Sequence, residues 1–391
     1  MVLEEQIYVY CDLFKNKTEG TMQIRPLFLV LAAFVLFTFT STAMTAEVDR
    51  HIQESAEVSE GMAFELEHGD GHVTITPWDR DEVSVDVRYH YEFSGIGVDE
   101  GDYDFSLDVS QRGNTLVIRG VEERPKRQLF ANSDRHEYSY KISAPAYLLL
   151  DIQGDDGNVT IREWENNVSI QGDDGDFLLS SIKADRVDLS IGDGDMLVTG
   201  ITANMDISGD DGEVELSQIR GDINIEINDG DAELRDIQGS ITFSGDDGNF
   251  SLSNSTVTNC RIDVNDGDVT IGQSSGNFTI DGDDSKVRID EVEAEQLNVD
   301  IGDADVWAYL LPSSETSVII QTEDGDVELR LADNVSADIT IETDGGSIDQ
   351  ELEAISDLRE GDGWFTGVLN GGDGNIRIET EDGDIHVQEG L

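Results

Sequence analysis

Apolar and polar positions alternate along most of the chain in step with a recurring turn. Asp-Gly turns return every 18 or 19 residues from Gly157 to Gly267, and the series continues through Ser285 and Ala304 to Gly345. With each of these turn residues set as position zero, positions +2 and +4 are apolar in nearly every repeat, and the residue between them is mostly polar. This alternation predicts a β-strand with one buried face. The predicted buried column at +2 includes Val159, Phe177, Met196, Val214, Phe250 and Val269.

A second apolar pair precedes each turn. Position −5 is apolar in every repeat from Ile152 to Ile320, position −7 is apolar in most, and another apolar residue follows at +7. One such repeat cannot bury its own apolar side, whereas stacked repeats form parallel ladders around a continuous core. The pattern therefore predicts an all-β, single-stranded parallel β-solenoid (β-helix) with about 18–19 residues and two short strands per coil.

The residues just before the turn follow a further pattern that repeats every two coils. Position −3 is glycine in one repeat and Ile or Val in the next, as in Gly172, Ile191, Gly209 and Ile227. The turn alternates with it between Gly-Asp-Asp-Gly and a form with Asn-Asp or Gly-Asp before the turn residue. Adjacent coils are therefore expected to differ.

The repeats divide the chain into four expected parts. These are a leader at residues 1–46, an N-terminal coil with an inserted hairpin or cap at 47–143, the regular solenoid at 144–346, and an irregular stretch with C-terminal strands at 347–391. The N-terminal part repeats the turn motif as His68-Gly-Asp-Gly71 before the register breaks. Caps are expected at solenoid ends, where an apolar cross-section would otherwise meet water.

The leader has the layout of a secretory signal peptide. Arg25 precedes an uncharged, mostly apolar run that ends in small residues, which is the order of features in export signals. Met22 fits as the true initiator, and we expect the mature chain to begin between Met44 and Glu47. Export predicts a location in the periplasm or at the cell surface. The alternative is an uncleaved N-terminal membrane anchor, because about 20 apolar residues can span a bilayer.

Net charge narrows the range of partners. The chain has 85 Asp and Glu residues against 24 Lys and Arg, which gives a formal net charge of −61. We expect no nucleic-acid partner, because phosphate binding needs a basic surface, and anionic membranes are disfavoured for the same reason. Adaptation to high salt, binding of divalent cations and simple solubility are all consistent with this acidity.

Stacking would place the turn aspartates in one column. Turn geometry accounts for one Asp per turn, since Asp tolerates left-handed backbone, but most turns carry two. Unit charges about 4.8 Å apart repel by roughly 1 kcal/mol even in water, so diffuse cations or bound calcium must offset the column. No resident cofactor is expected, and Ca²⁺ is the alternative. The candidate metal ladder is Asp174, Asp193, Asp211, Asp229, Asp247, Asp266, Asp284 and Asp303.

Both ends of the repeat region carry a family resemblance. The segment Tyr140–Ile152, which enters the first regular turn, and the ending Gly367–Val387 resemble the bacterial "putative adhesin" domain family. The hallmark of that family is repeated short strands of the type T-x-S/D-G-D/x-V-x-V. The resemblance covers roughly residues 60–391. It implies an envelope-associated β-solenoid with an adhesive role, and no catalytic residues carry over.

These features predict a passive protein and not an enzyme. We expect an exported structural or adhesin-like solenoid that is stabilised by cations or salt and contacts an unknown surface or envelope component. One alternative is a calcium-binding β-roll-like protein, although the repeat is not the Gly-Gly-x-Gly-x-Asp nonapeptide of calcium β-rolls. The other is a polysaccharide-active β-helix enzyme, which the turn position of the carboxylates and the few basic residues disfavour.

The remaining candidate residues have structural interpretations. The six histidines show no metal-ligand spacing and are expected to be solvated, and Cys260 falls at an inward position, which predicts a small core residue. Trp307 and Tyr309 lie on a predicted polar face and form a candidate contact spot.

Overall fold

The computed structural model describes residues 44–95, 104–123, 131–313, 316–353 and 355–390. In these ranges the chain forms 32 β-strands and no helix, so the all-β prediction is confirmed. Accordingly, none of the described residues belongs to a helix long and apolar enough to span a membrane. Met22 and residues 1–43 of the predicted leader lie outside the described residues, and the last three residues of that leader, 44–46, belong to the first strand.

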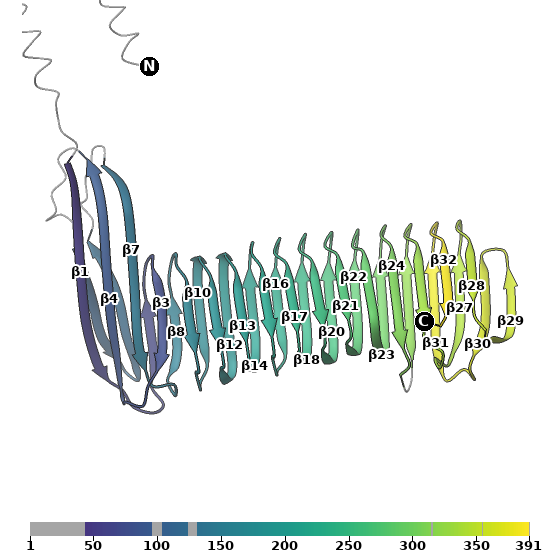
Figure 1. Ribbon diagram of the computed structural model, residues 1–391, viewed down its shortest axis with the longest axis horizontal. Helices are drawn as coiled ribbons and strands as arrows, with labels where there is room; N and C mark the ends of the chain where they lie inside the picture. The colour runs from purple at the N-terminus through teal and green to yellow at the C-terminus, as the bar shows by residue number, and fades with distance from the viewer. Residues whose placement is uncertain (1–43, 96–103, 124–130, 314–315, 354, 391) are drawn as a thin grey trace, which may run out of the picture.

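Two ladders of strands run along the molecule and give it the shape of a rod (Figure 1). Each strand of the regular part pairs in parallel with the strand two places away in the chain, so consecutive strands belong to opposite ladders. The ladder that precedes the Asp-Gly turns contains β2 (Ala63–Glu67), β8 (Leu149–Gln153), β10 (Val168–Asp174), β12 (Lys183–Asp193), β14 (Thr202–Gly209), β16 (Ile223–Ile227), β18 (Gln238–Gly245), β20 (Thr256–Val264), β22 (Ser275–Gly282), β23 (Val287–Ile301), β25 (Ser317–Thr322), β31 (Gly374–Thr380) and β27 (Ala337–Thr343).

The opposite ladder follows the turns and shares the long strand β23, which bends from one ladder into the other. It contains β3 (His72–Pro77), β9 (Val159–Arg162), β11 (Phe177–Ser180), β13 (Met196–Thr199), β15 (Val214–Ser217), β17 (Ala232–Arg235), β19 (Phe250–Ser253), β21 (Val269–Gly272), β24 (Val306–Leu311), β26 (Val327–Leu331), β32 (Ile385–Glu389) and β28 (Ile348–Glu351).

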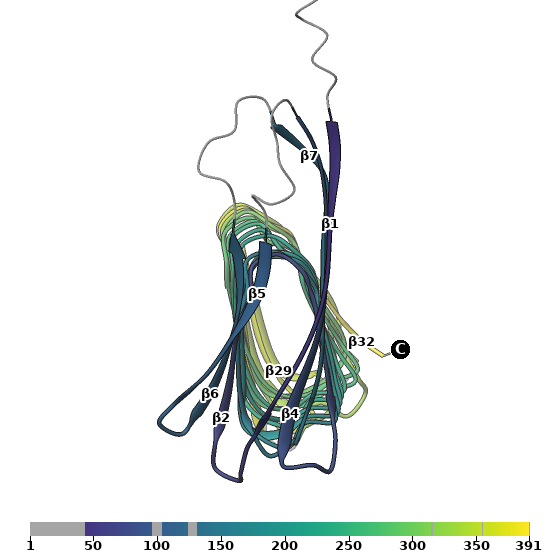
Figure 2. The same cartoon turned by 90° about the vertical axis from the view of Figure 1, so that its left-hand side faces the viewer.

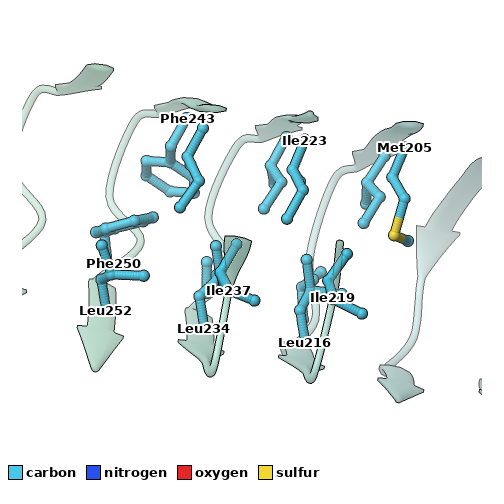
Figure 3. Packing of buried hydrophobic residues seen from close by; sticks show 14 of the residues in the cluster. Met205, Leu216, Ile219, Ile223, Leu234, Ile237, Phe243, Phe250 and Leu252 are labelled. Atoms are coloured by element: carbon cyan, nitrogen blue, oxygen red, sulfur yellow. The ribbon is translucent and has the colours of Figure 1, made fainter. Parts of the chain in front are cut away.

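Inward side chains of the two ladders meet in one continuous core, and Figure 3 shows part of it. The six residues predicted at position +2 are each at most 3% exposed, and the pairing register stacks them in a single column. The predicted buried column is therefore confirmed. Between the ladders, Phe243 of β18 packs on Phe250 of β19 with ring centroids 4.9 Å apart.

The two-coil alternation is a fit between large and small residues in adjacent coils. Ile191 is 4% exposed and Ile301 is 2% exposed, so both side chains are in the core. A Cβ added to Gly209 would lie 3.8 Å from Ile191 Cγ2, and one added to Gly282 would lie 3.2 Å from Ile301 Cδ1. Each large side chain therefore occupies space that the neighbouring glycine leaves open, as close packing requires.

At position −2, two of the alternating coils have an asparagine that hydrogen-bonds to the aspartate of the preceding coil. Asn228 donates from Nδ2 to Asp210 Oδ1 of the preceding coil at 2.9 Å, and Asn265 donates in the same way to Asp246. An amide between two carboxylates replaces a like-charge contact with a hydrogen bond to a charged acceptor.

Both ends depart from parallel pairing. At the N-terminal end, β4 (Glu82–Gly95) is antiparallel to β1 (Met44–Glu57) and β7 (Ala131–Ala144), and β5 (Asp104–Arg112) is antiparallel to β6 (Thr115–Glu123). The sheet is therefore mixed, and the prediction of a purely parallel solenoid is wrong at the ends. A hairpin ends the ladder more readily than another coil, because it covers the open edge without requiring a further crossover.

At the C-terminal end the chain crosses from one side of β27 to the other, which the sequence pattern did not indicate. Strand β30 (Trp364–Leu369) lies antiparallel between β27 and β29 (Ile355–Gly361). The chain then passes to the other side of β27, so that β31 pairs in parallel with both β25 and β27. The last coil in sequence is thus the second-last in space.

Three long strands extend beyond the turn edge at the N-terminal end (Figure 1). Strand β7 first pairs with β3 at Ser139 and His72, so residues 131–138 continue past the first Asp-Gly turn together with β4 and β1. Figure 2 shows β1, β4 and β7 apart from β5 and β6, with the coils stacked behind them. The extension forms a corner with the acidic turn edge.

Candidate functional site

The predicted metal ladder lies on one exposed edge of the rod. All eight of its aspartates are exposed. Asp174 pairs with Asp193 in parallel register, and Asp193 forms a β-bridge with Asp211. The remaining turns follow the same stacking, as shown by the hydrogen bond from the Asp303 N–H to the Asp283 carbonyl at 3.1 Å. Coil spacing thus fixes the distance between these charges, and metal binding at the ladder stays a prediction.

Where an aspartate directly follows the turn residue, at position +1, it has a different role. Asp195 Oδ1 accepts the backbone N–H of Glu213 in the next coil at 3.0 Å, and Asp231 Oδ1 accepts that of Asn249 at 2.9 Å. Further along the rod, Asp305 accepts the N–H of the next coil in the same way. These carboxylates satisfy backbone donors that lie just outside the strand ladder. The sequence analysis missed this role, although recurrence of Asp or Asn directly after the turn residue was a visible signal.

Partial desolvation and neighbouring like charges raise the pKa of two exposed turn aspartates. Partial desolvation among the stacked turns, followed by the charges of Asp247 and Asp211, raises the pKa of Asp229. Desolvation and the neighbouring Asp70 and Asp174 likewise raise the pKa of Asp156. At these two positions the charged form is therefore disfavoured in the folded state.

A cleft lies in the corner between the extended sheet and the first turns. Its volume is about 1080 Å³. The walls come from β1, β4 and β7 and from the turns around Gly71 and Gly157. Six Arg, Lys and His side chains line it in an otherwise acidic molecule, namely Arg50, Arg88, Lys141, His51, His72 and His90. Asp49, Asp70 and Asp156 also line the cleft, so positive and negative groups are mixed there.

His90 is the most strongly paired histidine of this cleft. Its Nδ1 lies 2.7 Å from Asp49 Oδ1, and this hydrogen bond raises the pKa of His90 and lowers that of Asp49. Among the described residues, Glu47, His90 and Glu92 form a group whose ligand atoms lie within 4.8 Å of one another. Strand pairing brings these residues together from β1 and β4, which is why sequence spacing alone did not reveal them.

Other candidates are core or packing residues. Cys260 is buried as predicted, and desolvation raises its thiol pKa to about 12. Tyr309 is only 7% exposed, although it pairs with Arg330 and lies outside the hydrophobic core, so it is a covered residue and not the exposed contact spot that was predicted. Trp307 lies under Arg288, whose Cζ is 4.1 Å from the ring centroid. His68 is also buried, contrary to the expectation that every histidine is solvated.

Several solved structures align with this chain at low sequence identity and low TM-score. Among solved structures, a putative cell adhesion protein from Clostridium sporogenes is 10% identical and covers 87% of this chain and 100% of its own, with a TM-score of 0.17. A putative adhesin from Parabacteroides distasonis is 12% identical and covers 72% of this chain and 93% of its own, with a TM-score of 0.23. TM-scores this low carry no argument about function.

Sequence comparison gives the firmer result. No curated protein matches this sequence significantly. The family model described as Toastrack DUF4097 matches residues 62–271 and again residues 239–388. Together these matches take in the N-terminal coil, the regular rod and the inserted C-terminal coil. The chain belongs to the Toastrack DUF4097 family.

Proposed function

We propose that this chain is an exported, envelope-associated rod that contacts other surfaces and catalyses no reaction, with cations stabilising its acidic edge. The observation that carries the proposal is the fixed column of exposed turn aspartates. Their spacing follows from the stacked backbone, so the repulsion cannot relax while the rod stays folded. Mobile cations lower such an energy by screening, since the Debye length falls from about 10 Å at 0.1 M salt to about 3 Å at 1 M.

The positions of the other charged side chains support a structural role. Position +1 carboxylates accept backbone N–H groups. On the strand faces, Arg186 pairs with Asp188 and with Asp206 of the next coil, at 2.6 and 3.0 Å. Arg261 pairs with Asp281 of the next coil at 2.6 Å. The pairs Arg186–Asp206 and Arg261–Asp281 join neighbouring coils, which supports a structural role for these charged groups.

Thermal melting under three conditions tests the role of cations. The mature chain would be melted in a chelator, in the chelator with molar sodium chloride, and with millimolar calcium at matched ionic strength. If diffuse cations screen the repulsion between the turn aspartates, the melting temperature should be higher in sodium chloride, with no additional gain from calcium. A gain from calcium beyond that of matched salt would support the calcium-binding alternative, because only ions bound to the folded state add stability by mass action. No response to salt would contradict the proposal.

A separate assay tests the absence of catalysis. The mature chain would be incubated with acidic and neutral polysaccharides, and new reducing ends and unsaturated products would be measured. The passive rod predicts none above a heat-treated control. Product formation that disappears on changing one carboxylate, with an unchanged melting temperature, would establish the enzyme alternative instead.

A further inference from the structure

The outermost strands at the two ends of the rod are built differently. Strand β1 is outermost at one end and β29 at the other (Figure 1). Among the described residues β1 pairs only with β4, over 14 residues and without a register shift. Strand β29 has seven residues, and a register shift between Ser356 and Arg359 interrupts its pairing. Short length and irregular pairing keep an edge strand from binding another strand, so only β1 is an open edge of regular length.

The end of the rod beside β1 is also incompletely covered. Figure 2 shows β1 running in front of the stacked coils. Ile52 and Ala56 of β1, with Leu107 and Val109 of β5, pack against the core but are only partly buried. Strand β5 contacts β1 and pairs, within the described ranges, only with β6. An open backbone edge beside partly exposed apolar side chains is suited to the addition of another strand.

The sequence of β1 is complementary to itself about Ile52. Arg50 and Glu54 lie two positions on either side of Ile52, and both are on the core-facing side of the strand, because their cross-strand partners Tyr89 and Val85 are buried. If two copies of β1 pair antiparallel about Ile52, each Arg50 lies opposite Glu54 of the second copy. Charges on this side of an edge strand normally discourage pairing, whereas these two have opposite signs and symmetric positions.

The other positions of β1 fit the same register. Ile52 lies opposite its own counterpart, and like charges meet only at the two ends of the pairing, between Glu47 and Glu57. A register centred on Arg50 or on Glu54 would instead place like charges on the symmetry axis, which is unfavourable. The remaining pairs are Val48 with Ala56, Asp49 with Ser55, and His51 with Gln53.

We infer that the mature chain forms a symmetric dimer in which the β1 strands of two copies pair antiparallel about Ile52. The pairing uses residues 47–57, which a chain beginning between Met44 and Glu47 retains. Antiparallel pairing rotates the second rod by half a turn, so the two rods point away from each other and their acidic edges lie on opposite sides of the joined sheet. The contact is closed and self-complementary, as in most protein dimers. It does not depend on the proposed function, because no residue of the predicted metal ladder takes part.

Disulfide trapping tests the register of this dimer. Cys260 is the one cysteine after the predicted leader and is buried, so Ile52→Cys adds an accessible thiol next to its own counterpart, within reach of a disulfide. Mild oxidation should link this variant into dimers. Ser55→Cys is the matched control on the same strand, because the two copies of residue 55 would lie about 20 Å apart. Equal trapping of both variants, or trapping of neither, would overturn the inference.

Charge reversal tests the same contact without a covalent bond. Sedimentation velocity over a concentration series, at low and at molar sodium chloride, should show the parent in monomer–dimer equilibrium. Arg50→Glu should weaken the dimer about tenfold, since two contacts between opposite charges become contacts between like charges. Arg50→Glu combined with Glu54→Arg should restore it, and melting temperatures check that every variant is folded. A parent that stays monomeric throughout, or a double variant as weak as the single one, would contradict the dimer.

Discussion

Two neighbouring aspartates of one turn have opposite effects on stability at the scale of single residues. Asp229 is exposed between like charges that raise its pKa. A group with a raised carboxyl pKa contributes most stability below its unfolded pKa and loses that contribution as pH rises through the folded value. Asp231 instead accepts the backbone N–H and the side-chain Nδ2 of Asn249, both at 2.9 Å.

Alanine at these two positions should therefore act in opposite directions. We expect Asp231→Ala to lower the free energy of unfolding by about 1 kcal/mol, the usual worth of a hydrogen bond. Asp229→Ala, its matched control in the same turn, should leave stability unchanged or raise it at neutral pH and low salt. Thermal or chemical unfolding of the two variants side by side measures the contrast, and equal losses in both would refute it.

His90 should confer a pH-dependent stability. Its pKa is raised by the hydrogen bond to Asp49, with further help from Glu47 and Glu92. The stabilisation is therefore full below the unfolded value of about 6.5 and is lost as pH rises through the folded value. His90→Gln should lower the melting temperature relative to the parent at pH 6 but not at pH 9. Asp49→Asn should remove the same pH-dependent difference, and a loss that is equal at both pH values would count against this pairing.

The sequence pattern predicted which residues are buried better than it predicted which residues contact one another. The columns at +2 and the inward Cys260 were readable because the spacing of strands and the period of side chains are fixed. Burial of His68 and pairing of His90 with Asp49 were not readable, because these contacts join segments across an irregular insertion. Likewise, nothing in the period showed which of two adjacent aspartates accepts a backbone N–H from the next coil.

Close approach of consecutive turns controls stability at the scale of elements. A Cβ on Gly212 would lie 2.2 Å from the carbonyl oxygen of Gly194, and the Gly212 φ of +133° is one that side chains rarely allow. The opposite corner is just as regular. Its residue six places after the turn is left-handed in coil after coil, as in Gln218 and Asp236. No single residue type marks this corner, so the sequence pattern alone did not reveal its regularity.

Alanine substitution at two glycines tests this packing. Gly212→Ala should cost at least about 2 kcal/mol of unfolding free energy, since both the backbone conformation and the contact with the preceding turn oppose it. Gly272→Ala is the matched control, because its Cβ would meet only the Asp290 carbonyl oxygen at 3.9 Å. That variant should be neutral or slightly stabilised. A tolerated Gly212→Ala would show that the turns can separate without cost.

The whole molecule combines a predictable rod with ends that were not predictable. Repetition determined the regular coils, since each strand meets the same environment. The ends depend on single segments, such as the hairpin formed by β29 and β30 and the coil of β31 and β32 inserted beside β25. No repeat pattern encodes the order in which such segments stack. The antiparallel caps and the crossing over β27 therefore became visible only in the structure.

Net charge is the dominant property at this scale. A formal charge of −61 is concentrated in part on one continuous edge of turns. Repulsion between the charges on this edge destabilises the folded rod, and we propose that the rod tolerates it because cations screen these charges. Removing charge from the edge without disturbing the turns should therefore stabilise the rod where screening is weakest.

The most direct measurement is the melting temperature of the double variant Asp229→Asn with Asp247→Asn, against the parent, from low to molar sodium chloride. Both side chains are exposed, and the backbone N–H groups of both residues bond carbonyls of the preceding coil, which asparagine preserves. The account predicts that the variant melts higher than the parent at low salt and that the gap closes as salt rises. A variant that melts lower than the parent at low salt would contradict it.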